Sequence, residues 1–214
     1  MSYFTVKDQS KAEFKEKKSI FIGQVKRVET EDEAKEFIQK IKSEHKEARH
    51  NVYAYIIGEN RMIQRYSDDG EPHGTGGIPM LEVLKKSDLT DVVVVVTRYF
   101  GGILLGTGGL ARAYSKGASL AIKEAGVVEK VKGISLEIVI EYDLLGKLQH
   151  VCAESNTHIE DIEYTDKVKI KILCEFSNLE KFQSQITEVT SGKANFEQAE
   201  EPKMYFKLEH RLYE

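Results

Sequence analysis

Three carboxylates stand within four residues of one another in the segment SDDGEPHGTGG, which begins at Ser67. They belong to Asp68, Asp69 and Glu71, and His73 follows them. Carboxylates this close repel one another unless a cation, a basic side chain or backbone N–H groups lie beside them. The segment therefore has three interpretations: an acidic turn, since Asp-Gly and Glu-Pro are turn formers, a loop that binds a partner, or a site for a hard cation such as Mg²⁺.

Glycine forms the second chemically informative pattern. The tetrapeptide GTGG occurs at residues 74–77 and again at residues 106–109, each time before a segment that is able to form a helix. Because unpaired N–H groups at a helix N-terminus attract anions, Gly108 and Gly109 are candidate binding residues. The alternative is a pair of tight turns with close helix packing. Neither copy is a Walker A loop, because no Gly-Lys-Ser/Thr sequence is present.

The third pattern is TRYFGG, which follows the apolar run VVVVV. Its Arg98 and Tyr99 stand at the carboxyl end of the predicted strand, the edge where ligands bind in open α/β sheets. Together with Arg112, Arg98 could hold a phosphate through the guanidinium fork, and Tyr99 or Phe100 could stack on a base. This arrangement indicates a surface that attracts anions.

Arg98 also has a structural interpretation, an ion pair with Asp68 or Asp69. No catalytic residue is predicted, because Ser67 and Ser115 lack a neighbouring histidine and the G-x-S-x-G setting. We expect no bound metal or other cofactor. The candidate binding residues are Asp68, Asp69, Glu71, His73, Arg98, Tyr99, Gly101, Gly102, Gly108, Gly109 and Arg112.

The elements that position these residues fall into two predicted domains, residues 1–133 and 134–214. The chain has 214 residues, enough for two modest cores. Residues 1–133 contain 22 Lys and Arg against 19 Asp and Glu, whereas residues 134–214 contain 9 against 16. The acidic second half is therefore a poor candidate for nucleic-acid binding. With no secretory signal and no apolar run of membrane length, we expect a cytoplasmic protein that does not contact a membrane.

Strands and helices alternate along the chain. In the first domain we predict strands at residues 19–28, 51–57, 61–66 and 91–97, a helix capped by Thr30, and a second helix at 107–126. In the second domain we predict strands at 134–142, 158–164, 168–176 and 203–212, with one helix capped by Asp143 and another by Ser177 or Asn178. The order βαββαβ is that of a ferredoxin-like domain. Cys152 and Cys174 are predicted to be reduced and packed.

These patterns together resemble the YigZ/IMPACT family along nearly the whole chain. The matching stretches are Lys17-Lys18-Ser19, His50, Tyr53-Ala54-Tyr55, SDDGEP, TRYFGG, Leu105-Gly106, Gly108-Gly109-Leu110 and Arg112-Ala113-Tyr114. The resemblance implies an α+β protein, with a first domain similar to the second domain of a small-subunit ribosomal protein. It implies a second domain similar to the C-terminal domain of elongation factor G. Eukaryotic members of the family regulate translation.

The leading hypothesis is a non-enzymatic binding protein linked to translation, which contacts RNA, the ribosome or a ribosome-associated protein through its first domain. The alternative is a divalent-metal-dependent enzyme that acts on a phosphate ester. Its active site would be a crevice between residues 67–75 and 98–102.

Overall fold

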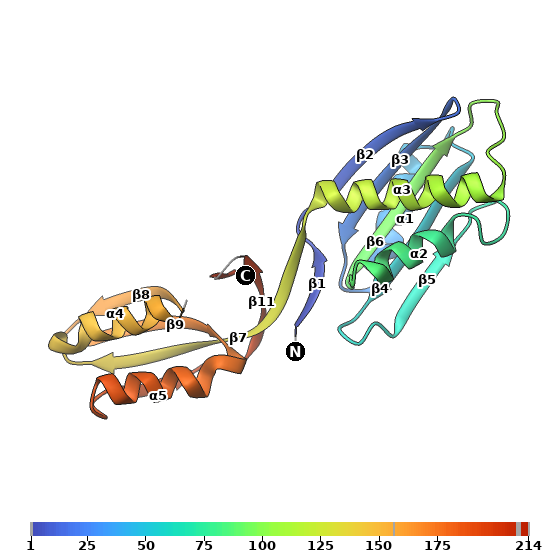
Figure 1. Cartoon of the computed structure of the whole chain (residues 1–214). Helices are drawn as coiled ribbons and strands as arrows, with labels where there is room; N and C mark the ends of the chain where they lie inside the picture. Colours follow the sequence, from blue (N-terminus) through green and yellow to red (C-terminus); the bar gives the residue numbers. More distant parts are fainter. Residues whose placement is uncertain (1, 156, 209–210, 214) are drawn as a thin grey trace. The chain divides into compact units, whose positions relative to one another are not determined.

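The computed structural model describes residues 2–155, 157–208 and 211–213. They form two compact units, Tyr3–Val128 and the residues from Glu129 onward together with Ser2, each of mixed α and β structure as the sequence predicts (Figure 1). The predicted boundary between residues 133 and 134 falls inside one long strand, β7 (Val127–Ile140).

The N-terminal domain is built on a five-stranded antiparallel sheet. In sheet order its strands are β2 (Ser10–Glu16), β3 (Ser19–Arg27), β6 (Val92–Tyr99), β4 (His50–Ile57) and β5 (Ile63–Ser67). The apolar strand β6 is central, as expected for a strand that is covered on both faces. Because all four strand pairs are antiparallel, the ligand-edge rule for parallel α/β sheets does not apply to Arg98 and Tyr99.

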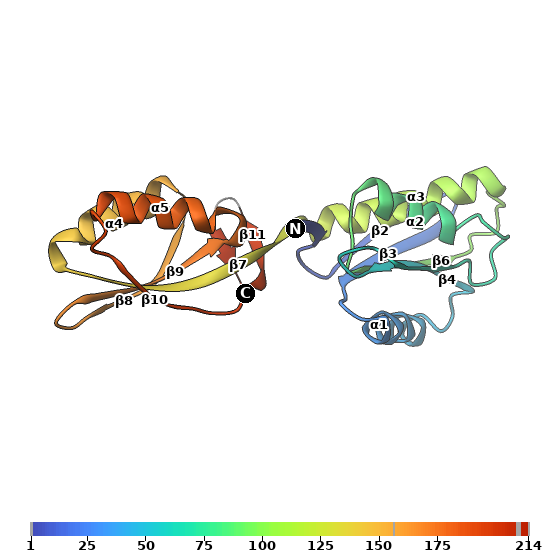
Figure 2. The same ribbon diagram turned by 90° about the horizontal axis from the view of Figure 1, so that it is seen from below.

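Helices cover both faces of this sheet (Figure 2). Two of them, α2 (Gly77–Lys86) and α3 (Thr107–Ala125), pack with Val94 and its alternate neighbours on one face. Helix α1 (Glu31–Glu44) packs on the other face with Val93 and Val95. The short strand β1 (Ser2–Val6) is tied to the chain before β6, where the Thr90 N–H donates to the Phe4 carbonyl.

Two predicted helix ends are confirmed. The Thr30 hydroxyl accepts from the Glu33 N–H at 3.2 Å and so caps α1. The Glu33 carboxylate accepts from the Glu29 N–H at 2.8 Å, so the capping box closes one residue before the cap. Helix α3 ends at Gly126, whose φ of 70° suits a glycine C-cap.

The C-terminal domain has the ferredoxin-like order. After β7 come α4 (Leu145–Glu154), β8 (His158–Tyr164), β9 (Val168–Glu175), α5 (Leu179–Val189) and β10 (Asn195–Ala199). The strands lie in the order β10-β7-β9-β8, all antiparallel. The fourth strand of the motif is therefore β10 and not residues 203–212. That stretch forms β11 (Lys203–Leu208) and β12 (Arg211–Tyr213), and β11 pairs with the first half of β7.

The two helices of this domain start differently from the prediction. Short 3₁₀ turns, Tyr142–Leu144 and Phe176–Asn178, precede α4 and α5. No side chain caps either helix, so neither Asp143 nor Asn178 has the expected role.

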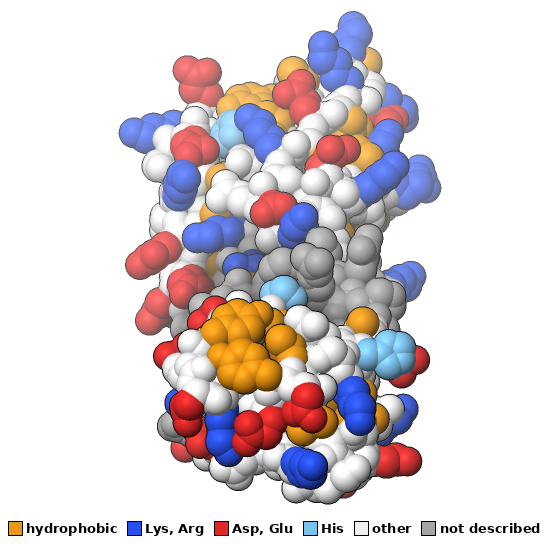
Figure 3. All heavy atoms as spheres, turned by 90° about the vertical axis from the view of Figure 1, so that its left-hand side faces the viewer, with side chains coloured by type: hydrophobic (Ala, Val, Ile, Leu, Met, Phe, Trp, Pro, Cys, Tyr) orange, Lys and Arg blue, Asp and Glu red, His pale blue; other side chains and the backbone are white. Residues whose placement is uncertain are grey.

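Two aromatic side chains stack on the surface of the C-terminal domain. The rings of Tyr142 and Tyr164 stack with centroids 6.4 Å apart, and both are exposed. Figure 3 shows one face of the molecule with a compact apolar patch and acidic side chains beside it. Inside the domain, Cys152 and Cys174 are free and buried, as predicted, and burial raises the pKa of each thiol to about 11. In the part of the chain that the structure describes, no helix has the length and apolar composition to cross a membrane.

Candidate binding site at the end of the central strand

A buried ion pair anchors the loop SDDGEP to the central strand. The Arg98 side chain is 6% exposed and that of Glu71 is 4% exposed, and Arg98 Nη1 donates to Glu71 Oε1 at 2.7 Å. The Tyr114 hydroxyl, from α3, donates to the same oxygen at 2.7 Å. Burial and then the Glu71 charge raise the pKa of Tyr114, which keeps it a donor. The partner of Arg98 is thus Glu71, and the predicted pair with Asp68 or Asp69 is wrong.

The first GTGG binds an aspartate of its own chain. The Asp68 carboxylate accepts from the N–H groups of Gly74, Gly76 and Gly77 at 2.7, 2.9 and 2.8 Å. Burial acts to raise the pKa of Asp68, but these donors outweigh burial and hold the pKa below its ordinary value. The anion that this glycine turn attracts is therefore internal. His73 lies exposed on the same loop.

The third carboxylate also has internal partners. Asp69 accepts from Lys42 Nζ and from the Asn51 N–H, both at 2.6 Å, and its carbonyl accepts from His50 Nδ1 at 2.9 Å. The three carboxylates thus have different hydrogen-bond partners, and His50 links two of them, since its Nε2 lies 4.0 Å from Glu71 Oε1. Among the described residues, no three His, Cys, Asp or Glu side chains gather so as to hold a metal ion. The hydrogen bonds of the three carboxylates are those of a structural turn.

Tyr99 does not share a surface with Arg98. Successive strand residues point to opposite faces, and the Tyr99 hydroxyl lies 2.9 Å from Nδ1 of His45, at the end of α1. Burial, and after it the nearby Lys11, lowers the pKa of His45. Phe100 does lie beside Arg98, with its ring centroid 5.3 Å from the guanidinium carbon.

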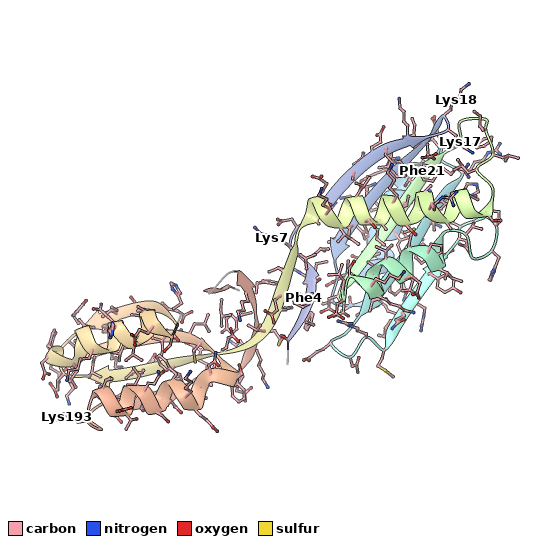
Figure 4. The ribbon with its side chains drawn as sticks, in the orientation of Figure 1. Phe4, Lys7, Lys17, Lys18, Phe21 and Lys193 are labelled. Atoms are coloured by element: carbon pink, nitrogen blue, oxygen red, sulfur yellow. The ribbon has the colours of Figure 1, made fainter. Side chains whose placement is uncertain are left out.

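The two glycines of TRYFGG have backbone roles. A Cβ on Gly101 would lie 2.0 Å from the carbonyl carbon and oxygen of Lys18, so only glycine fits where this loop crosses the turn between β2 and β3. The Gly101 N–H donates to the Ser19 hydroxyl at 3.2 Å, and Gly102 has a φ of 83°. Figure 4 shows Lys17 and Lys18 on that turn, next to the loop after β6.

The second GTGG differs from the first because no carboxylate of a described residue is hydrogen-bonded to it. Helix α3 begins after Gly106, which has a φ of 72° and makes no side-chain cap. The Leu110 N–H donates to the Gly106 carbonyl, which leaves Gly108 and Gly109 in the first turn. Their N–H groups are among those that an α-helix leaves without an internal partner.

Two neighbouring pockets flank this N-terminus. The first, which we call the Arg98 pocket, has a volume of about 370 Å³. Its lining includes Arg49, His50, Arg98, Phe100, Leu104 and Leu110. The second, which we call the basic pocket, has a volume of about 260 Å³. Its lining includes Glu16, Lys17, Gly109, Arg112 and Lys116.

The two pockets share Leu105, so Arg98 and Arg112 line adjacent pockets. Sequence reasoning missed Arg49 and Lys116 as lining residues. They are ordinary surface cations in sequence, and no spacing marks them. Lys17 was signalled by the family resemblance, although no role was assigned to it.

Comparison with known proteins identifies both domains. Residues 17–122 match the family model of the Impact N-terminal domain. Residues 138–193 match a domain of unknown function, DUF1949. A solved structure titled "Crystal structure of an hypothetical protein" is 29% identical and superposes with a TM-score of 0.60, covering 94% of this chain and 98% of that one.

Relatives from bacteria match along most of their length. The IMPACT family member YvyE of Bacillus subtilis is 47% identical over 93% of this chain and 92% of its own. The IMPACT family member YigZ of Escherichia coli is 32% identical over 82% of this chain and 87% of its own.

A eukaryotic relative matches over a shorter segment. Protein IMPACT of Xenopus laevis is 48% identical over 62 residues, which are 28% of this chain and 19% of its own.

Proposed function

The chain belongs to the IMPACT family, and from that membership we propose that it is a non-enzymatic cytoplasmic binding protein of the translation machinery whose N-terminal domain contacts RNA. The link to translation comes from what the family resemblance implies for eukaryotic members. Because a fold does not determine a function, the choice of RNA as the ligand rests on the chemistry of the basic pocket.

The observation that carries this proposal is a set of cations around the uncovered N-terminus of α3. Lys17, Lys18, Arg112 and Lys116 are all exposed. Among the described residues, none of the four has an ion-pair partner, although Glu16 also lines the pocket. Lys116 Nζ lies 4.5 Å from the centre of the Phe14 ring. Cations beside helix N–H groups suit the phosphates of a nucleic-acid backbone.

The distribution of charge supports the same domain. Residues 1–133 have a net charge of +3 and residues 134–214 a net charge of −7, from the Lys, Arg, Asp and Glu of the sequence. Phosphate neutralisation requires Lys and Arg, so the C-terminal domain should contribute little to RNA affinity. We infer that its acidic surface serves as a steric cap or docks to another protein.

The test is the salt dependence of RNA binding by the full chain, measured by fluorescence anisotropy with a short labelled single-stranded RNA. Lys17→Ala and Arg112→Ala should each reduce the log–log salt slope by about one unit if each residue contacts one phosphate. Lys7→Ala is the matched control, because Lys7 is exposed at the opposite end of the same domain (Figure 4). Lys193→Ala, in the C-terminal domain, is the second control.

Equal slopes for the wild-type chain and for Lys17→Ala and Arg112→Ala would refute this assignment of the RNA surface. A Lys193→Ala effect as large as that of Lys17→Ala would refute the charge argument. Co-sedimentation with ribosomes, before and after nuclease treatment, then tests whether the RNA is ribosomal. Binding that survives complete nuclease digestion would show a protein partner in place of RNA.

A further inference from the structure

The Arg98 pocket differs in chemistry from the basic pocket beside it. Its walls are apolar, formed by Leu105 and Leu110 together with Phe100 and Leu104 of the loop after β6. Phe100 is 46% exposed and Leu104 is 82% exposed. Apolar side chains held this open to solvent, around one buried cation, are typical of a ligand site.

Arg98, which lines the pocket, has an unsatisfied donor. Arg98 is almost fully buried, yet its Nε has no hydrogen-bond partner among the described residues. Among the described residues, the Arg98 side chain donates one hydrogen bond, from Nη1 to Glu71. A buried N–H without an acceptor is destabilising, and such a group in a native protein calls for a bound water, ion or ligand.

The charges around the pocket favour an anion. The Glu71 carboxylate is already shared by Arg98 and Tyr114. Arg49 on the rim is exposed and, in the described chain, has no ion-pair partner. The lining also includes Gly106 and Thr107 at the start of α3, the positive end of the helix dipole.

We propose that the Arg98 pocket binds the C-terminal residue of a protein partner, with the terminal carboxylate on Arg98 and an apolar side chain against the leucines. Arg98 uses Nη1 for Glu71, and the planar fork of a guanidinium has further N–H groups that match the two oxygens of a carboxylate. A phosphate would bring additional negative charge towards the buried Glu71.

The size and walls of the pocket determine the rest of the assignment. A C-terminal residue places one carboxylate and one apolar side chain on the same Cα, which suits a volume of about 370 Å³. The walls are mainly aliphatic, which fits an apolar side chain better than a nucleotide. This site is separate from the basic pocket, so it does not depend on RNA binding.

The probe is the blocked dipeptide N-acetyl-glycyl-phenylalanine, titrated into the full chain and followed by NMR, with its C-terminal amide as the comparison ligand. The acid should bind at least about tenfold more tightly than the amide, because the amide loses a charge-assisted pair of hydrogen bonds. Leu104→Glu removes a wall and adds a like charge, and it should weaken binding of the acid by about tenfold. Ile103→Glu is the matched control, because Ile103 is the neighbouring exposed residue (41%) and does not line the pocket.

Equal affinity for the acid and the amide would overturn the proposal, as would equal effects of Leu104→Glu and Ile103→Glu. If free 3-phenylpropionate binds as tightly as the dipeptide, the partner is a small acid and not a protein terminus. Displacement of the dipeptide by inorganic phosphate or by the RNA would also overturn the assignment. Lys17→Ala should leave dipeptide affinity unchanged and Leu104→Glu should leave the RNA salt slope unchanged, so the two proposals fail independently.

Discussion

Replacing Glu71 by alanine should destabilise the N-terminal domain strongly. The substitution removes the acceptor that Arg98 Nη1 and the Tyr114 hydroxyl share at 2.7 Å each. It leaves a guanidinium that is 6% exposed without its counter-charge. Breaking a buried ion pair by removing one partner costs about 3–5 kcal/mol. The melting temperature changes by about 3 °C per kcal/mol for a domain of this size, so the midpoint of thermal unfolding should fall by about 10–15 °C.

The assay is urea unfolding of the full chain, read by NMR signals of β6 so that it reports on the N-terminal domain. Glu82→Ala is the surface control, since Glu82 pairs with Lys85 at 3.2 Å on the exposed face of α2, and such pairs contribute at most about 1 kcal/mol. The double variant Glu71→Met with Arg98→Met should recover most of the loss, because a buried pair can be replaced by apolar residues at little cost.

A Glu71→Ala loss below about 1 kcal/mol would refute this reasoning, because it would mean that water or another residue reaches Arg98 readily. A double variant as unstable as Glu71→Ala would show that the cavity, and not the unpaired charge, sets the cost.

Three further predictions concern single residues. Asp68→Asn should lower the free energy of unfolding at neutral pH. The folded pKa of Asp68 lies below its ordinary value of 3.8, so the stabilisation by its carboxylate is present above 3.8 and is lost as the pH falls through the folded pKa. Urea unfolding at decreasing pH should therefore show a shrinking difference between this variant and the wild type. Gly101→Ala should lower the free energy of unfolding by about 3 kcal/mol or more, because the new Cβ would lie 2.0 Å from the Lys18 backbone. Gly108→Ala is the control: the nearest atom to its Cβ would be 3.7 Å away, so it should unfold at nearly the wild-type urea concentration. The pKa of His45 is lowered in the folded protein, so neutral His45 stabilises the fold above pH 6.5, and this stabilisation is lost as the pH falls through the folded pKa. His45→Gln should therefore make the melting temperature less dependent on pH across that range.

The sequence predicts most of the fold where local chemistry decides it. The Thr30 cap, the Gly126 stop and the central position of β6 follow from capping residues, a C-terminal glycine and a continuous apolar run. Strand β7 was predicted too short because its first residues, directly after Gly126, lack a clear apolar alternation. Strand β10 was missed because its sequence NFEQA is polar, whereas 203–212 alternates more strongly.

The candidate site is harder to predict because it depends on contacts between segments distant in sequence. Glu71 and Arg98 are 27 positions apart, and no local pattern distinguishes Glu71 from Asp68 or Asp69 as the partner. The sequence could have predicted that Tyr99 and Arg98 lie on different surfaces, because adjacent residues on a strand face opposite sides of the sheet. The sequence could not predict which of the two glycine turns an aspartate would cover, because that depends on where each loop folds back.

The position of β2 at the edge of the five-stranded sheet has a consequence for self-association. An edge strand has unpaired N–H and C=O groups that can template another chain. Along β2, the exposed Lys11, Glu13 and Lys15 alternate with half-buried residues. If a second copy paired with β2 so that the two Glu13 residues were opposite each other, Lys would face Lys and Glu would face Glu, which destabilises the strand pair. The charges of β2 thus protect this edge of a sheet whose central strand, β6, is apolar.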